Sequence, residues 1–186
     1  MTTQDAPGPV QPGEPAPDFT LPAIHREGLI SSADYRGRKP LLLALFRGLW
    51  CPFCRRAIVQ LGTARERLDA IGVETLAVVA TTPENARLYF RFRPTKVPLA
   101  ADPDLVTHHA FRLPKPPLTP ELIEQLGATH VNPTGELPEP LSLAHVDDAL
   151  DRLHGFKATE TDLSDKERQF PQLKDQFLVD QAEIVR

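Results

Sequence analysis

The feature that most constrains the fold is a pair of cysteines between an apolar run and a helical pattern. Residues 41–46 read Leu-Leu-Leu-Ala-Leu-Phe, which is typical of a strand buried on both faces of a sheet. The chain then reads Cys-Pro-Phe-Cys at residues 51–54, and apolar residues recur at intervals of three and four from Pro52 to about Ala70. Because proline suits the first position of a helix, this order predicts a strand, a turn and a helix that begins at the cysteine pair.

Strand and helix signals alternate along the chain. A second apolar run at residues 75–80 is followed by Thr82-Pro83-Glu84, which is typical of a helix start because the threonine can cap the first turn. Two strand–helix units in succession predict a central sheet that is mainly parallel. Weaker signals predict strands at 18–21 and 97–101, a short helix at 102–111, and a C-terminal hairpin at 176–180 and 183–186.

The chain has 186 residues, a length that suits one domain better than two. Residues 1–17 are polar and rich in proline, so we expect a flexible N-terminal lead-in and then a single domain over residues 18–186. The alternation is interrupted at about 115–173, where a helix is predicted at 142–154 and a charged segment at 157–168. We interpret this stretch as an insertion whose helix docks on the main domain. The expected fold class is α/β: a central mixed sheet flanked by helices, with an insertion before the C-terminal hairpin.

Composition excludes several classes of partner. The formal charge is −4, with 21 basic and 25 acidic residues, so the chain lacks the electrostatic footprint of a nucleic-acid binder. No apolar stretch reaches the ~20 residues needed to cross a bilayer, and the first residues do not follow the basic-then-apolar pattern of an export signal. We therefore expect a cytoplasmic protein with no nucleic-acid and no membrane partner.

The spacing of the two cysteines indicates redox chemistry. A thiol attacks as the thiolate, and a helix N-terminus favours that anion through its unpaired N–H groups and its dipole. Cys51 occupies such a position, and the nearby Arg47, Arg55 and Arg56 add positive potential. Cys54 lies nearly one turn further on, on the apolar stripe, and is expected to be less exposed. We therefore expect Cys51 to attack, Cys54 to resolve, and the pair to form a redox-active disulfide.

Two alternatives for the cysteines are weaker. A chance pair of structural cysteines is disfavoured because the preceding strand, Trp50 and Pro52 all agree with a redox motif, and we count Trp50 and Pro52 as supporting residues. A zinc site needs about four ligands, of which one such pair supplies two. The six histidines are scattered, so we expect no metal and assign them surface or capping roles: His25, His108, His109, His130, His145 and His154.

Three stretches in succession resemble the alkyl hydroperoxide reductase/thiol-specific antioxidant (AhpC/TSA) family: Gly13–Pro22, Phe46–Cys54 and Phe177–Asp180. More narrowly, the stretch Phe46–Cys54 resembles the peroxiredoxin-like branch that carries an Arg-Gly-x-Trp-Cys-Pro-aromatic-Cys motif. The resemblance covers about residues 13–113 and 174–186. It implies a thioredoxin-like fold, an antioxidant thiol peroxidase or thiol-disulfide oxidoreductase, no cofactor, and a thioredoxin-type or glutathione reductant.

By this resemblance Cys51 matches the peroxidatic cysteine of peroxiredoxins and the attacking cysteine of thioredoxins, whereas Cys54 matches the resolving cysteine of thioredoxins only. Peroxiredoxins carry a proline and a threonine or serine where this chain has Ala44 and Gly48, and an arginine where it has Lys174. Lysine keeps the positive charge but loses the forked donors of arginine. These differences favour disulfide exchange over fast peroxide reduction, with Lys174 as a further supporting residue.

Two more departures concern the C-terminal part. Thioredoxins place a cis-proline immediately before the late strand, where this chain has Asp175 and Gln176, so no substrate-cradling proline is expected there. Relatives continue beyond the position of Arg186 into a segment that covers the sheet, and the sequence is either naturally short or truncated. An uncovered sheet face would favour either a homodimer or disorder.

Two functions of different classes follow. The first is a thiol-dependent oxidoreductase that reduces peroxides or disulfides, with Cys51 attacking and Cys54 resolving. The second is a redox-responsive binding protein, in which the Cys51–Cys54 disulfide switches a docking surface built from residues 115–173.

Overall fold

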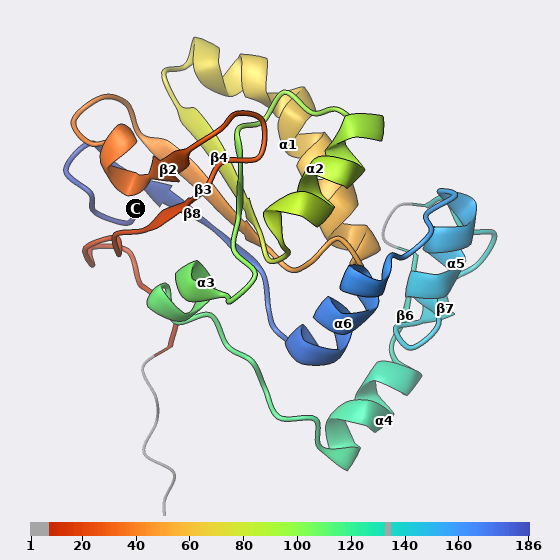
Figure 1. The fold of residues 1–186 in the computed structure, drawn as a ribbon. Helices are drawn as coiled ribbons and strands as arrows, with labels where there is room; N and C mark the ends of the chain where they lie inside the picture. Colours follow the sequence, from red (N-terminus) through yellow and green to blue (C-terminus); the bar gives the residue numbers. More distant parts are fainter. Residues whose placement is uncertain (1–7, 133–134) are drawn as a thin grey trace, which may run out of the picture.

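The computed structural model describes residues 8–132 and 135–186. Its centre is a four-stranded sheet in the order β5-β4-β3-β8 (Figure 1). The first three strands along the sheet are parallel, and β8 runs antiparallel to β3. The α/β class with a central mixed sheet is therefore confirmed. The strands are β3 (Leu41–Phe46), β4 (Glu74–Val79), β5 (Leu99–Ala101) and β8 (Asp175–Val179).

The side chains of β3 alternate between two cores, one on each face of the sheet. Leu43 and Leu45 belong to the first core, which also contains Phe111 and Phe177. Ala44, between the two leucines, belongs to the second core. All three β3 residues are fully buried, as expected for a strand covered on both faces.

Two helices cover the face to which Ala44 points: α1 (Pro52–Ala70) and α2 (Pro83–Phe92) (Figure 1). Each begins with proline in its first turn, and Cys51 and Thr82 are the respective N-cap residues. Both caps accept a hydrogen bond from a backbone N–H of the first turn. The predicted starts of both helices are confirmed.

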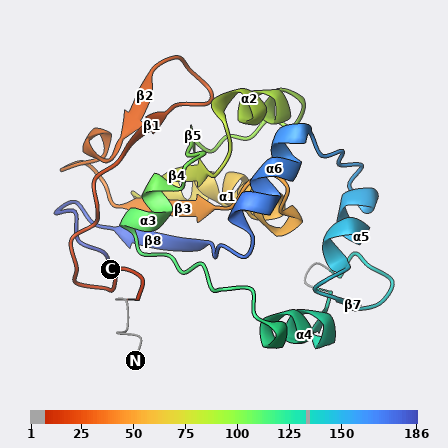
Figure 2. The same ribbon diagram turned by 60° about the horizontal axis from the view of Figure 1, so that its bottom comes forward.

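The opposite face is covered by the hairpin of β1 (Thr20–Pro22) and β2 (Leu29–Ser31) and by α3 (Val106–Ala110) (Figure 2). The short helix η1 (Ser32–Asp34) follows β2 and has no buried residue. The helix predicted at 102–111 is α3, which is shorter than expected. Its first turn is fixed by the Asp102 carboxylate, which accepts hydrogen bonds from the N–H groups of Val106 and Thr107 at 2.9 and 2.8 Å.

The N-terminal segment is part of the fold from Val10 onward. Val10 is buried, and the N–H groups of Gly13 and Ala16 donate to the carbonyl oxygens of Val185 and Glu183 at 2.8 and 2.7 Å. The expectation of a flexible lead-in is therefore wrong for residues 10–17, because these backbone groups pair with the C-terminal turn. Residues 1–7 lie outside the described part of the chain.

The segment between α3 and β8 contains more regular structure than the sequence predicts. The helix expected at 142–154 is present in shortened form as α5, and the charged segment forms a full helix, α6, with a capping box between Thr159 and Asp162. Figure 2 shows α4 and α5 beyond the end of the sheet to which β3 points, with α6 between them and the sheet. The elements are α4 (Pro120–Ala128), β6 (His130–Val131), β7 (Leu141–Ser142), α5 (Val146–Leu153) and α6 (Glu160–Gln169).

Two other details differ from expectation. His108 is fully buried, 3.9 Å from the Asp102 carboxylate, so surface or capping roles do not describe every histidine. The C-terminal hairpin is a short turn, in which Asp180 N–H donates to the Ile184 carbonyl at 2.9 Å and Val185 bridges to Val179.

Among the described helices, none is long and apolar enough to span a membrane.

Candidate active site

The two cysteines lie at the N-terminal end of α1, where the chain leaves β3. Cys51 is the N-cap residue and Cys54 lies in the first turn. Both thiols are free in this structure, and both side chains are fully buried. The backbone N–H of Cys54 donates to Sγ of Cys51 at 3.3 Å and also to the Cys51 carbonyl at 3.1 Å, so a first-turn donor of the helix is shared with this sulfur.

Arg47 supplies the second contact to the Cys51 sulfur. Its Nη2 lies 3.0 Å from Sγ of Cys51, and its guanidinium carbon is 4.8 Å from the centre of the Trp50 ring. Of the three arginines singled out from the sequence, Arg47 is the one that reaches the sulfur. Arg55 turns away to the Leu49 carbonyl at 2.6 Å. Its direction could not be read from the sequence, because spacing alone does not fix where a long side chain points.

These contacts shift the pKa values of the two thiols in opposite directions. Burial opposes ionisation of Cys51, but hydrogen bonds from Cys54 and the charge of Arg47 outweigh it and lower the pKa of Cys51 to about 6. Burial raises the pKa of Cys54 well above its usual value, and the neighbouring Cys51 raises it further. The site is therefore arranged so that Cys51 is the thiolate and Cys54 the thiol.

A glutamine from the inserted segment holds the loop in front of Cys51. Gln169, the last residue of α6, is fully buried. Its Oε1 accepts hydrogen bonds from the N–H of Gly48 and from Nε1 of Trp50, both at 3.0 Å, and its Nε2 donates to the carbonyl of Ala80 at 2.6 Å. Gln169 thus ties the loop to the end of β4. Sequence reasoning does not find it, because a single glutamine in a charged stretch carries no recognisable signal.

The same contacts explain the glycine at position 48. A Cβ atom there would lie 2.6 Å from Cδ1 of Trp50 and 3.0 Å from Oε1 of Gln169. Any larger residue would push both groups away from the loop. The Trp50 and Gln169 side chains therefore occupy the space into which a side chain at position 48 would extend.

The remaining predicted site residues lie around the cysteines. Pro52 is the buried first residue of α1, and Trp50 packs edge-on against Phe170 with 6.3 Å between the ring centres. Lys174 is exposed, with Nζ 5.8 Å from the centre of the Phe46 ring, and its charge acts to lower the pKa of Cys54 against the effect of burial. The charge of Lys174 thus acts on Cys54, while Arg47 contacts Cys51.

A cis peptide bond joins Phe170 to Pro171 on the segment that leads into β8. Sequence reasoning that considers only Asp175 and Gln176, which are the first two residues of β8, misses this proline. Among the described residues, no three histidine, cysteine, aspartate or glutamate side chains form a group that could hold a metal ion.

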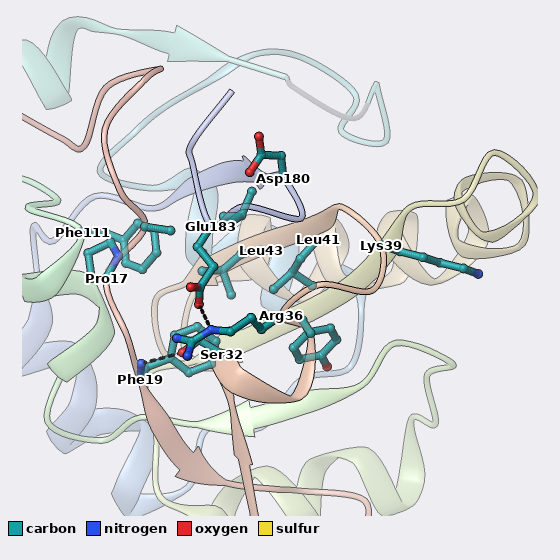
Figure 3. A pocket seen from close by; sticks show the side chains of 13 residues that line it. Pro17, Phe19, Ser32, Arg36, Lys39, Leu41, Leu43, Phe111, Asp180 and Glu183 are labelled. Carbon is teal, nitrogen blue, oxygen red and sulfur yellow. Dashed lines mark hydrogen bonds and ion pairs between the residues drawn. The ribbon is translucent and has the colours of Figure 1, made fainter.

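An apolar cavity of about 340 Å³ adjoins the cysteine motif. Arg47 and Phe53 of the motif region form one wall, and the inserted segment supplies the others. The lining residues are Arg47, Phe53, Leu126, Val131, Leu143, Asp147 and Phe170. A second cavity, shown in Figure 3, lies at the opposite end of β3 beside the Arg36–Glu183 ion pair, but its volume of about 20 Å³ suits one water molecule.

The sequence matches the AhpC/TSA family over residues 12–140. The chain belongs to this family. The match includes β1 to β5, Arg47, both cysteines and the start of the inserted segment, so the resemblance seen in the sequence motifs is confirmed. Membership of this family supports thiol-dependent oxidoreduction. No curated protein matches the chain.

Solved structures of similar fold include both peroxide-reducing and disulfide-exchanging proteins. Peroxidoxin BcpB from Mycobacterium tuberculosis aligns with a TM-score of 0.59 and 11% identity, covering 95% of this chain and 82% of the other. Reduced 2-Cys peroxiredoxin from Plasmodium vivax gives 0.58 and 16%, covering 96% and 70%. A candidate thiol:disulfide interchange protein DsbE from Chlorobium tepidum gives 0.53 and 19%, covering 95% and 82%. At these identities the similarity shows the thioredoxin-like fold of the AhpC/TSA chain and nothing finer.

Proposed function

We propose that this AhpC/TSA protein is a dithiol oxidoreductase in which Cys51 attacks and Cys54 resolves. The observation that carries the proposal is the environment of the Cys51 sulfur, which accepts hydrogen bonds from Arg47 at 3.0 Å and from the Cys54 N–H at 3.3 Å. Two donors on a buried sulfur stabilise a thiolate, and the thiolate is the nucleophile. Burial protects that anion from unspecific oxidants.

The first step on a disulfide substrate is attack by the Cys51 thiolate on one substrate sulfur. A bond forms between that sulfur and Cys51, the substrate S–S bond breaks, and the second substrate sulfur leaves as a thiolate that takes a proton from solvent. With a peroxide, the thiolate attacks an oxygen instead and the O–O bond breaks. Cys51 becomes a sulfenic acid, and the departing oxygen takes a proton from solvent and leaves as water or an alcohol. Both routes leave Cys51 without its negative charge.

Loss of that charge activates Cys54. In the reduced state, burial is the main cause of the raised pKa of the Cys54 thiol, and the hydrogen bond and charge of Cys51 add to it. Once Cys51 is covalently occupied, these two added causes disappear, whereas the charges of Arg47 and Lys174, which lower the pKa of Cys54, remain. Cys54 therefore becomes more acidic at the moment when it must attack Sγ of Cys51 and form the intramolecular disulfide.

Disulfides are the favoured substrates. Gly48 supplies no hydroxyl to position a peroxide oxygen, and the Trp50 and Gln169 side chains fill the space that such a hydroxyl would need. A complete cycle oxidises one dithiol to a disulfide by two electrons, so it needs a thiol reductant of the thioredoxin or glutathione type. The cytoplasmic location, the homodimer and the single-domain organisation of residues 18–186 stay predictions.

Trapping tests the proposal. Reduced Cys54→Ser protein is mixed with hydroxyethyl disulfide or with hydrogen peroxide plus dimedone, and the adduct is located by mass spectrometry. We expect a stable mixed disulfide at Cys51 that forms faster than the dimedone adduct, whereas the wild-type chain accumulates the Cys51–Cys54 disulfide. Cys51→Ser is the matched control and should form no adduct at Cys54. Adducts at Cys54 in that control, at the rate seen for Cys51, would overturn the assignment of roles.

A redox-responsive binding protein is the second candidate. It is favoured by contacts between the inserted segment and the cysteine loop, namely Gln169 with Trp50 and Asp151 with Arg55. If the disulfide changes this segment, oxidised and reduced samples should differ in proteolysis between residues 115 and 173. Identical cleavage patterns would remove this candidate.

A further inference from the structure

The inserted segment does more than cover the cysteines, because it builds most of the apolar cavity beside them. Leu126 comes from α4, Val131 from β6, Leu143 follows β7, and Phe170 follows α6. These four side chains come from separate elements and meet Phe53, which lies between the two cysteines. A cavity of about 340 Å³ falls within the size range of sites that hold small organic groups.

Arg47 connects the cavity to the attacking sulfur, because it lines the cavity and its Nη2 lies 3.0 Å from Sγ of Cys51. Cys51 itself is fully buried and does not line the cavity. Nε of Arg47 is buried without a hydrogen-bond partner, so the guanidinium keeps an unused donor. A group held in the cavity therefore lies against the residue that holds the sulfur.

The geometry points to this cavity as the substrate pocket of the proposed oxidoreductase, one that takes a single aryl or branched-alkyl group attached close to the bond that Cys51 attacks. The inference rests on the proposed function and adds the substrate class. Five of the seven lining residues are apolar, so a substrate with such a group gains from burying it there, and a small polar substrate does not. Arg47 would bind an oxygen or sulfur acceptor next to the reacting bond.

Alkylation tests the pocket without requiring turnover. The Cys51 thiolate displaces iodide from iodoacetamide and from N-benzyliodoacetamide, which share one reacting group and differ by one aromatic ring. The ratio of the two rate constants at Cys51 is divided by the same ratio for N-acetylcysteine. We expect a preference for the benzyl reagent on the order of tenfold, as follows from burying a phenyl group. A corrected ratio of one or less would overturn the pocket.

The second test fills the pocket with a larger side chain. Leu126→Trp places a ring in the cavity and should abolish the benzyl preference, so that the corrected ratio falls to about one. Ile123→Trp is the matched control on the same helix, since Ile123 is 58% exposed and does not line the cavity. Leu143→Phe repeats the test from another wall, in case Leu126→Trp does not fold. Unchanged preference in a folded, filled variant contradicts the proposal.

A comparison of substrates shows whether the apolar group belongs to a disulfide or to a peroxide. Bis-benzyl disulfide is compared with hydroxyethyl disulfide, and cumene hydroperoxide with hydrogen peroxide, each in the wild-type and Leu126→Trp chains. If the Leu126→Trp chain loses the wild-type preference for the apolar compound in one pair, that pair identifies the substrate as a disulfide or a peroxide. If the wild-type chain prefers the apolar compound in neither pair, the pocket is refuted as a substrate site. Benzyl-selective alkylation without turnover of any of the four compounds would refute the proposed function while the cavity still binds apolar groups, so the two failures are distinguishable.

Discussion

Oε1 of Gln169 lies 3.0 Å from Nε1 of Trp50, and this contact joins the inserted segment to the residue before Cys51. The same oxygen accepts the N–H of Gly48, and the amide nitrogen of Gln169 donates to Ala80. One buried side chain therefore fixes the loop that carries Arg47, and with it the distance from Arg47 to the Cys51 sulfur.

Replacing Gln169 should change the chemistry as well as the stability. Gln169→Met leaves buried polar groups unpaired, at a cost of about 1–3 kcal/mol for each. Because the loop also loses its anchor, the pKa of Cys51 should rise, and the pH profile of its alkylation should move upward. Gln172→Met is the matched control, since Gln172 is equally buried but bonds to the carbonyls of Leu113 and Pro114. An equal shift of the profile in both variants would show a merely structural role for Gln169.

Introducing at position 48 the threonine that peroxiredoxins carry should not speed up peroxide reduction. Gly48→Thr places a Cβ where Trp50 and Gln169 already lie, and overpacking of this kind costs about 1–3 kcal/mol. We expect lower stability in thermal unfolding and slower oxidation of Cys51 by hydrogen peroxide. Gly48→Ala should likewise lower the stability and slow the oxidation of Cys51. Gly127→Ala is the control and should do neither, because a Cβ at that position would meet nothing within 4 Å. Faster peroxide reduction by Gly48→Thr would contradict this account of the loop.

Arg47 should control the reactivity of Cys51. Arg47→Met removes a donor and a positive charge from the thiolate, so the pKa of Cys51 should rise. Its alkylation at neutral pH should then slow, on the order of tenfold for each unit by which the pKa exceeds the assay pH. Arg56→Met is the control, since Arg56 lies in α1, pairs with Glu136 and does not contact the sulfur. Similar slowing in both variants would point to a general charge effect.

Asp147 should act in the opposite direction. Its negative charge is one of the causes that raise the pKa of Cys51, although it is outweighed by the donors. Asp147→Asn should therefore lower the pKa of Cys51 further and shift the alkylation profile to lower pH. Asp148→Asn removes a charge from the adjacent, exposed position on α5 and should leave the profile unchanged. A shift to higher pH in Asp147→Asn would contradict the electrostatic account.

The parts of the site that sequence could predict are those fixed by neighbours in the chain. The strand at 41–46 and the helix from Pro52 follow from local apolar patterns and a capping position, so Cys51 and Cys54 are placed correctly without long-range information. The expectation of a flexible N-terminal segment is wrong because its backbone partners lie at the other end of the chain.

The rest of the site depends on contacts between distant residues. Gln169 is 121 residues from Gly48 in sequence, and α6 carries too weak an apolar pattern to be recognised among its charges. The choice of Arg47 over Arg55 as the partner of the sulfur depends on side-chain direction. Likewise, the apolar cavity needs residues from separate elements of the inserted segment, and no local pattern brings these together.

The pH dependence of Cys51 alkylation in the reduced wild-type chain tests the central claim most directly. The pKa of Cys51 is lowered, so the thiolate fraction rises as the pH increases through the folded-state value and is complete above it. Mass spectrometry of the first-alkylated residue should find Cys51, with a rate that rises with a midpoint near pH 6 and then levels off. A midpoint near the ordinary cysteine value of about 8.5, or first alkylation at Cys54, would contradict the account.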